Sequence, residues 1–193
     1  MIYLEIYNKI KKRRSIRRFK QKEIELSILK KFVNAARLAP SAANLQPLEF
    51  FIVNDVELKK KLFTTLSWAG YLKPEWKPAE NERPAAYIII LADKSISNWY
   101  QRDASFAAEN IILCAEEKGI GSCVICKVDK ESLGKIIHLP YNLIIDSVIA
   151  LGYKNEQPVV EEYKDSIKYW KDEDDVLHVP KKKLENIIHI NNF

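Results

Sequence analysis

The segment from Arg13 to Phe19 reads Arg-Arg-Ser-Ile-Arg-Arg-Phe and places four guanidinium groups and a hydroxyl group within six residues. An arginine side chain is always charged and presents several rigid N–H donors, which suits the oxygen atoms of a phosphate. The same spacing also fits a solvated basic helix end, where the helix dipole favours cations. The arginine segment is therefore a candidate anion site whose partner must be identified from the rest of the chain.

A second polar segment, from Pro40 to Pro47, reads Pro-Ser-Ala-Ala-Asn-Leu-Gln-Pro and is a loop bounded by prolines. Its hydroxyl and amide groups offer hydrogen-bond donors and acceptors on a restricted backbone, which suits a planar heterocycle with imide and carbonyl edges. A purely structural loop is the alternative interpretation.

The cysteines and histidines do not follow the spacing of a metal site or a nucleophilic catalytic site. Cys123 and Cys126 form a single C-x-x-C in a predicted strand, where side chains three positions apart diverge, so we expect buried and inert thiols. The histidines, none of which has metal-ligand spacing, are His138, His178 and His189. Neither a G-x-G-x-x-G motif nor a P-loop motif occurs, so a Rossmann or P-loop nucleotide site has no support.

The composition predicts one ordinary globular domain over residues 1–193, with 47% hydrophobic and 30% charged residues. The net charge of +5 is mild and gives only weak support to nucleic acid as a partner. No apolar run reaches the roughly 18 residues of a membrane span, and residues 1–14 have no signal-peptide cleavage site. With three cysteines, an odd number, these features favour a cytoplasmic protein in reducing surroundings.

Hydrophobic periodicity predicts helices interleaved with four strands, and hence an α/β or α+β sandwich. The helices are predicted over residues 3–12, 23–38, 55–66, 102–118, 129–137 and 184–188. The strands are predicted over residues 48–53, 85–92, 121–126 and 144–153. Gly119 is a candidate C-cap and Asp129 a candidate N-cap. Residues 67–84 are expected to be irregular, and residues 154–180 lack a clear period, so we expect them to form an arm rather than a core element.

The order of these segments resembles the nitroreductase family of FMN-dependent oxidoreductases. The arginine segment, the next helix and the proline-bounded loop resemble the opening of that family. Further similar stretches are residues 68–72, 83–91, 103–110, 119–123 and 148–152. Residues 179–185, Val-Pro-Lys-Lys-Lys-Leu-Glu, resemble the closing basic motif. Each motif is weak alone, but their order and spacing over nearly the whole chain are specific.

The resemblance implies an α+β subunit with a central mixed sheet flanked by helices. It further implies a homodimer with two FMN sites at the subunit interface, in which residues 154–193 form an arm that embraces the partner subunit. FMN would be the cofactor and NADH or NADPH the co-substrate. A small-molecule electron acceptor is implied as a further partner, with neither nucleic acid nor a membrane.

The resemblance also assigns cofactor-binding roles at matching positions. The residues implied around the FMN phosphate and ribityl chain are Arg13, Arg14, Ser15 and Arg17. The lysines implied to contact the phosphate from the C-terminal segment are Lys181 and Lys182. Lys183 could replace either, because the alignment of the three lysines with the family motif is uncertain by one residue. The residues implied to lie against the isoalloxazine ring, from the other subunit, are Pro40, Ser41, Ala42 and Asn44, with Gln46 close by. The backbone segment implied near flavin N5 consists of Ile125, Cys126 and Lys127.

The sequence departs from the family pattern in two places, which comprise three residues. Cys126 and Lys127 occupy a segment that often contains glycine, and Leu48 follows the Gln-Pro pair where tryptophan is frequent. We expect FMN binding to persist and the range of substrates to differ.

The implied activity moves hydride from NAD(P)H through flavin N5 to a small electrophilic acceptor, such as a nitroaromatic or a quinone, in a ping-pong cycle. No side chain stands out as an obligatory acid or base, so no catalytic residue is predicted. Two alternatives stay open. A flavin-binding storage or sensor protein would show no turnover, and a small basic nucleic-acid-binding module would be colourless and would bind with steep salt dependence.

Overall fold

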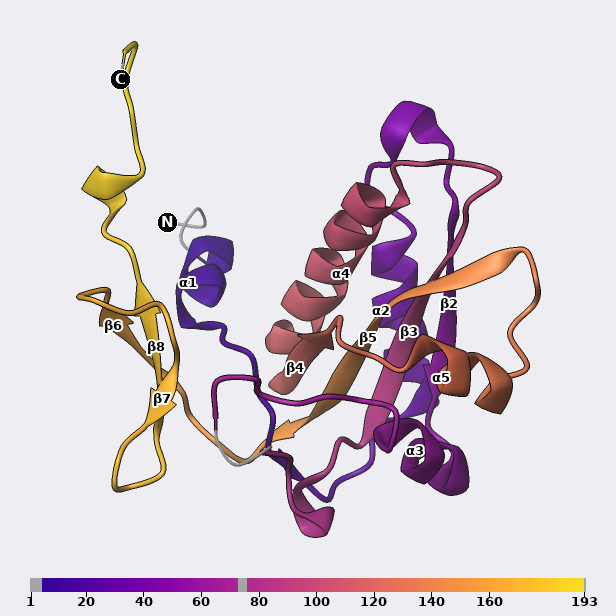
Figure 1. Cartoon of the computed structure of the whole chain (residues 1–193), viewed down its shortest axis with the longest axis horizontal. Coiled ribbons are helices and arrows are strands. Elements are labelled where there is room, and N and C mark those ends of the chain that lie inside the picture. Colours follow the sequence, from indigo (N-terminus) through magenta and orange to yellow (C-terminus); the bar gives the residue numbers. More distant parts are fainter. Residues whose placement is uncertain (1–4, 73–75, 193) are drawn as a thin grey trace.

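The computed structural model describes residues 5–72 and 76–192, and Figure 1 shows a β-sheet with helices on both faces. The helices are α1 (Glu5–Lys12), α2 (Leu26–Ala36), α3 (Val56–Phe63), α4 (Tyr100–Glu117) and α5 (Lys130–Ile136). The main-sheet strands are β1 (Phe19–Lys20), β2 (Leu48–Val53), β3 (Ala86–Asp93), β4 (Ile120–Ile125) and β5 (Leu143–Lys154). The predicted α+β class is confirmed. Tyr3, with which the first predicted helix begins, lies outside the described residues.

Strand β5 organises the main sheet, because β1, β3 and β4 all pair with it and β2 is added beyond β3. All four ladders are antiparallel. A parallel bridge between Ser15 and Ser122 attaches the arginine segment to β4 and makes the sheet mixed at this point. Sequence reasoning predicted four of these five strands and missed β1, because two residues are too few for a periodic pattern.

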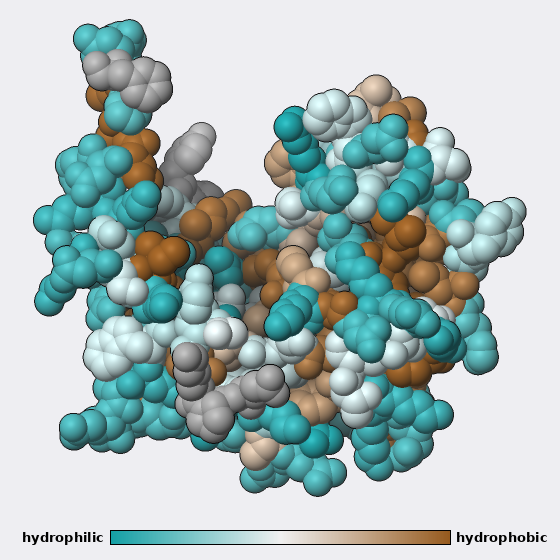
Figure 2. Space-filling view, in the orientation of Figure 1, coloured by the Kyte–Doolittle hydropathy of each residue, from teal (hydrophilic) through white to brown (hydrophobic). Residues whose placement is uncertain are grey.

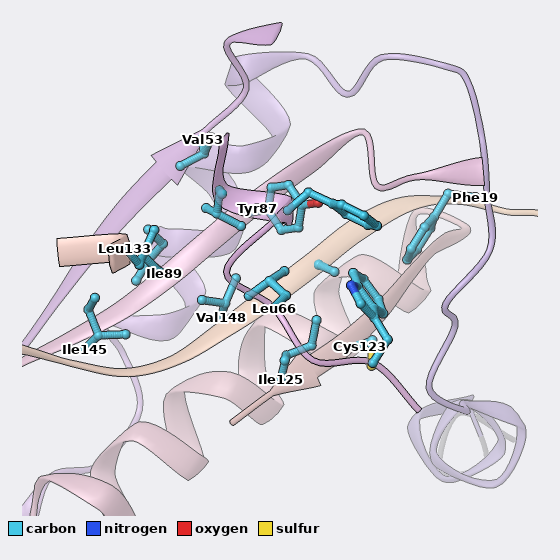
Figure 3. Close-up of a cluster of buried hydrophobic side chains, with 14 of the residues drawn as sticks. Phe19, Val53, Leu66, Tyr87, Ile89, Cys123, Ile125, Leu133, Ile145 and Val148 are labelled. Carbon is cyan, nitrogen blue, oxygen red and sulfur yellow. The ribbon is translucent and has the colours of Figure 1, made fainter. Parts of the chain in front are cut away.

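Alternating side chains of β3 build two separate cores. Ile88 and Ile90 pack with α2 and α4 on one face. Tyr87 and Ile89 face the other side, which Figure 3 shows together with Leu133 of α5. Because successive side chains of a strand point to opposite faces, a fully apolar strand such as β3 must be covered on both sides.

The predicted N-cap is confirmed, and the predicted C-cap is displaced by one residue. Lys118 is the C-cap of α4, and Gly119 follows it with φ of 68°, a left-handed conformation that costs glycine little. The Asp129 side chain accepts a hydrogen bond from the Ser132 backbone N–H at 3.1 Å at the start of α5. These caps fix the two ends of the segment that contains β4.

Residues 154–180, which lack a clear period and were expected to form an arm, contribute to three short strands that the sequence did not predict. Strands β6 (Val159–Glu162), β7 (Trp170–Lys171) and β8 (Leu177–Lys181) form a second sheet in the order β6-β8-β7. The helix predicted over residues 184–188 is only a 3₁₀ turn, Leu184–Asn186. In Figure 1 the chain beyond β8 extends away from the main sheet.

His178 joins the strands of this second sheet and provides a testable pH dependence. Its Nε2 lies 2.9 Å from Asp172 Oδ2 and its Nδ1 lies 3.3 Å from Glu161 Oε2. The hydrogen bond to Asp172 is the main reason that the pKa of His178 is raised above 6.5. Because the folded pKa is raised, the stabilisation is fully present below about pH 6.5 and is lost as pH rises through the folded pKa.

We therefore expect the NMR titration midpoint of the His178 imidazole to exceed 6.5, and Asp172→Asn to lower it. An unchanged midpoint in the variant would contradict the assigned cause. Glu161→Gln is expected to lower the midpoint less than Asp172→Asn does. The contact of Glu161 with the imidazole is longer than that of Asp172 and contributes less to the raised pKa of His178.

Gly152 of β5 lies directly against the buried ring of Phe19, so a side chain here has no space. A Cβ atom would lie 2.7 Å from Phe19 Cδ1. We expect Gly152→Ala to lower the free energy of unfolding by about 1–3 kcal/mol, measured by urea denaturation. Gly134→Ala in α5 is the control, because its Cβ would meet Leu139 at an ordinary 3.7 Å and alanine favours a helix. A Gly152→Ala variant as stable as the wild type would contradict this packing.

Within residues 5–72 and 76–192, no helix is long and apolar enough to cross a membrane. The same residues contain no cluster of three or more His, Cys, Asp or Glu side chains that could hold a metal ion.

Candidate functional site

The arginine segment runs from the end of α1 to β1 and is fixed along the edge of β4. The Ile16 backbone N–H donates to the Ser122 carbonyl oxygen at 2.9 Å. Gly121 makes this close approach possible, because a Cβ atom there would lie 2.7 Å from the Ile16 side chain. Ile16 is buried whereas its arginine neighbours are partly exposed. One buried anchor therefore holds the guanidinium groups in position around it.

The four arginines have different partners. Arg18 is bound to Glu82, with its Nε 2.9 Å from both carboxylate oxygens, and to Asp175. The hydrogen bond with Glu82 raises the pKa of Arg18, which identifies this residue as a structural cation. Arg13 has only a distant ion pair, with its Nε 4.0 Å from Glu109. Arg17 places its guanidinium 4.8 Å from the centre of the Tyr169 ring.

Arg14 is the least satisfied member of the segment. Its Nε is buried and has no hydrogen-bond partner among the residues that the structure describes. Burial, together with the charge of Arg13, lowers the pKa of the Arg14 guanidinium. An anion bound beside these two arginines would relieve both effects, because it would supply an acceptor and a compensating charge.

A cavity of about 880 Å³ opens beside Arg14, where the chain passes from β5 to β6. Its basic lining residues are Lys11, Lys12, Arg14, Lys20 and Lys154. Of its two acids, Glu116 pairs with Lys154 at 2.6 Å, and Glu156 accepts hydrogen bonds from the backbone N–H groups of Arg17 and Arg18. The cavity is thus predominantly basic. Figure 2 shows the C-terminal segment standing apart from the rest of the molecule, with a hollow between them.

The segment Ile125, Cys126 and Lys127 continues β4 away from the arginine segment. The strand ends at the buried Ile125, whereas Cys126 is exposed. The prediction of a buried thiol is therefore wrong for Cys126 and correct for Cys123, whose pKa is raised by burial. The Lys127 carbonyl accepts a hydrogen bond from the Ser67 N–H at 3.0 Å. This contact ties the end of β4 to the irregular segment after α3.

The proline-bounded loop has a restrained and unusual backbone. Ala43, Asn44 and Gln46 have positive φ angles of 49°, 57° and 52°. The Asp103 Oδ1 of α4 accepts a hydrogen bond from the Ala42 N–H at 3.0 Å, and the Ser41 Oγ accepts one from the Gln46 N–H at 3.1 Å. Left-handed conformations of residues other than glycine persist only where surrounding contacts hold them. The loop is therefore built as a fixed shape.

One chain does not bring this loop to the arginine segment. The loop leads into Leu48, which is aligned through Ala92 with Ile144 of β5. Phe19, at the end of the arginine segment, is aligned with Lys154 at the other end of the same strand. Ten strand residues separate the two positions, which corresponds to roughly 33 Å. The loop and the arginine segment instead approach different points of α4, because Ala42 bonds to Asp103 and Arg13 lies near Glu109. These two acids are six residues apart, or roughly 9 Å along the helix. No contact among the described residues joins the predicted ring-contacting residues Pro40, Ser41, Ala42, Asn44 and Gln46 to Arg13, Arg14, Ser15 or Arg17.

The basic triplet lies at the end of β8, next to β6. Lys181 is aligned with Glu162 of β6, and the neighbouring Val159 and Val160 line the basic cavity. The Lys183 Nζ lies 3.0 Å from Glu162 Oε1. The ion pairs found within the described residues include Lys183 but neither Lys181 nor Lys182. In the part of the chain that the structure describes, Lys181 and Lys182 therefore have no carboxylate partner.

Sequence reasoning gave no role to three residues that shape the site, namely Glu82, Asp103 and Glu156. Each bonds across a large distance in sequence, such as Glu156 to Arg17 or Asp103 to Ala42. An acid flanked by unrelated residues gives no local signal of such a contact. Asp103 lies in one of the stretches that resemble the nitroreductase family, but the resemblance assigned it no role.

Comparison with known proteins shows what the chain is similar to. The family model described as "Nitroreductase family" matches residues 10–153. A protein of Archaeoglobus fulgidus, whose assignment as an NADH dehydrogenase/NAD(P)H nitroreductase is provisional, is 33% identical over 75% of this chain and 83% of its own length. An iodotyrosine deiodinase of Thermotoga neapolitana is 28% identical over 78% of this chain and 89% of its own length.

Solved structures show the same similarity in three dimensions. An FMN-dependent nitroreductase from Clostridium difficile superimposes with a TM-score of 0.71 and 29% sequence identity. The superposition covers 97% of this chain and 99% of the other.

Proposed function

The chain belongs to the nitroreductase family, and we propose that it is an oxidoreductase that uses FMN to transfer electrons from NADH or NADPH to a small electrophilic acceptor. Nitroaromatics and quinones are the acceptors proposed. The observation that carries this proposal is the arginine segment, which β4 holds in place and in which the guanidinium groups of Arg13, Arg14 and Arg17 have no close carboxylate partner among the described residues. The FMN-dependent relative in Clostridium difficile supports FMN as the cofactor.

The arginine segment fits a phosphate dianion. The buried and unpartnered Arg14 Nε is the strongest sign, since a buried donor without an acceptor is costly. We propose that Arg13, Arg14, Ser15 and Arg17 hold the phosphate and the ribityl chain. Lys181 and Lys182 are proposed to complete the phosphate site, while Lys183 is occupied by Glu162.

A second copy of the chain is proposed to supply the loop that contacts the ring. Within one chain no contact among the described residues joins Pro40–Gln46 to the arginine segment, and the strand positions next to them, Leu48 and Phe19, lie roughly 33 Å apart along β5. A twofold homodimer would place the loop of each copy against the arginine segment and Ile125–Lys127 of the other. Apolar side chains left exposed support this assembly, namely Ile6, Tyr7 and Ile10 of α1 and Leu184, Ile187, Ile188 and Ile190 of the C-terminal segment. That segment is the part of residues 154–193 proposed to reach the partner.

FMN, when bound, supplies the redox chemistry, accepting a hydride equivalent from NAD(P)H and passing it to the acceptor. The protein positions the cofactor and adjusts its electrostatics. The cationic groups stabilise negative charge, and the fixed backbone of the proline-bounded loop presents N–H and carbonyl groups to a planar ring. The chain is not assigned a catalytic acid or base of its own.

Steady-state kinetics tests turnover and separates the enzyme from a flavin store. We expect the purified protein to oxidise NADH or NADPH when menadione or a nitroaromatic is present. The double-reciprocal plots at several acceptor concentrations are expected to be parallel, as for a ping-pong cycle. A flavin-containing protein that oxidises neither nucleotide with any such acceptor would instead support the storage or sensor alternative.

A further inference from the structure

A second cavity, of about 570 Å³, lies between the end of α3 and the segment after it. Its described walls combine aromatic rings with cations and contain no acidic side chain. The aromatic lining residues are Phe63, Trp68 and Trp76, and the basic ones are Lys77, Arg83 and Lys127. This composition differs from the basic cavity beside Arg14, which has no aromatic lining residue and two acids.

The floor of the cavity is rigid. The rings of Phe63 and Trp68 lie 5.7 Å apart, and the Arg83 guanidinium lies 4.2 Å from the centre of the Phe63 ring. Phe63 and Trp68 are only 6% and 7% exposed. Leu66, which lies between them in the sequence, forms a β-bridge with Val128 in the segment after β4. The Leu66 side chain belongs to the buried core shown in Figure 3.

The outer wall is fixed by the C-terminal part of the same chain. The Lys171 ammonium lies 5.1 Å from the centre of the Trp76 ring. The rings of Tyr71 and Tyr169 lie 4.9 Å apart. Residues distant in sequence therefore hold both sides of the cavity in place.

The charges around this cavity are not neutralised by the described residues. None of Lys77, Arg83 and Lys127 takes part in an ion pair within the ranges 5–72 and 76–192, in contrast to Arg18 with its two carboxylates. The Arg83 Nε and the Trp68 Nε1 are also buried without a hydrogen-bond partner among the same residues. A cluster of cations with low-dielectric aromatic walls favours an anionic ligand with a flat apolar body.

We propose that this cavity binds the electron acceptor and selects a planar aromatic ring that carries a negatively charged oxygen group, such as an aromatic carboxylate. The inference rests on the proposed function, because Lys127 also belongs to the segment proposed to lie beside the flavin. The ring packs among Phe63, Trp68 and Trp76, and the anionic group faces Lys77 and Arg83. The cations then act as specificity determinants for the acceptor.

Two nitro compounds of the same ring size, 4-nitrobenzoate and its neutral analogue 4-nitrobenzamide, provide the test. The variant Lys77→Glu reverses an exposed charge of the cavity, and Lys94→Glu, in the turn after β3, is the matched control. We expect the wild type to have a kcat/KM about tenfold higher for the carboxylate than for the amide. This tenfold preference corresponds to about 1.4 kcal/mol of binding free energy. Lys77→Glu should remove most of it by raising the KM for the carboxylate, because the attraction to the anionic group is lost. The kcat/KM for the amide and the flavin content should stay unchanged.

Calorimetric titration of the oxidised protein with 4-nitrobenzoate gives a readout that needs no turnover. Arg83→Gln and Lys77→Glu should each weaken this binding, whereas Lys94→Glu should not. Equal kcat/KM for the two compounds in the wild type would overturn the proposal, and so would loss of flavin from Lys77→Glu, which would assign the cavity to the cofactor. Carboxylate binding by a protein that shows no turnover would leave the cavity assignment standing and contradict the proposed function instead.

Discussion

The double variant Arg13→Ala/Arg17→Ala is expected to lose FMN while remaining folded. Charge-assisted hydrogen bonds contribute about 1.5–3 kcal/mol each, so removal of two phosphate contacts should weaken FMN binding on the order of 10²–10⁴-fold. Folding should persist because Ile16, which anchors the segment to β4, is unchanged, and the strong ion pair of the segment belongs to Arg18. Fluorescence titration with FMN measures the affinity, and circular dichroism with thermal melting measures the fold.

The control variant Lys60→Ala/Lys61→Ala removes the same amount of charge from exposed positions of α3. It should bind FMN as the wild type does, which separates a local contact from a general loss of positive charge. If Arg13→Ala/Arg17→Ala keeps wild-type affinity, the arginine segment does not hold the phosphate.

Asp103→Ala is expected to have the second largest effect, although Asp103 is not placed in direct contact with the cofactor. Its side chain is 2% exposed and holds the Ala42 N–H at the start of the proline-bounded loop. Loss of the acceptor leaves that N–H unpaired, at a cost of about 1–3 kcal/mol. Because Ala43, Asn44 and Gln46 need outside contacts to stay left-handed, the loop should relax and FMN should bind at least tenfold more weakly.

The conservative variant Asp103→Asn keeps a carbonyl oxygen that can accept the hydrogen bond from Ala42. It should restore most of the FMN affinity, whereas a purely charge-based role for Asp103 would make it as defective as Asp103→Ala. Hydrogen exchange of the Ala42 amide should be fast in Asp103→Ala and slow in Asp103→Asn. Wild-type affinity and slow exchange in Asp103→Ala would show that the loop does not depend on this contact.

Local patterns predicted the main elements because those elements bury continuous apolar faces. The strand predicted over residues 48–53 has the same bounds as β2, and the apolar run of β3 led to the correct expectation of cover on both faces. The sheet formed by β6, β7 and β8 was not predictable in this way. Val159 is aligned with His178, far along the chain, and the polar residues of these short strands follow no period.

The candidate site was only partly predictable for a similar reason. The arginine segment and the proline-bounded loop are continuous in sequence, so their chemistry was visible. Their partners are distant in sequence, as with Glu82 for Arg18 and Asp103 for Ala42, and emerge only from the fold. The cations of the aromatic cavity come from two distant segments, Lys77 and Arg83 from the connection between α3 and β3 and Lys127 from the segment after β4. The bridge between Leu66 and Val128 joins these segments beside the cavity.

The visible spectrum of the purified protein, recorded without air, tests the central claim most directly. The account predicts a yellow protein with the absorption bands of oxidised flavin, bleached by NADH or NADPH and restored when a quinone or nitroaromatic is added. A colourless protein that takes up no added FMN would contradict the account.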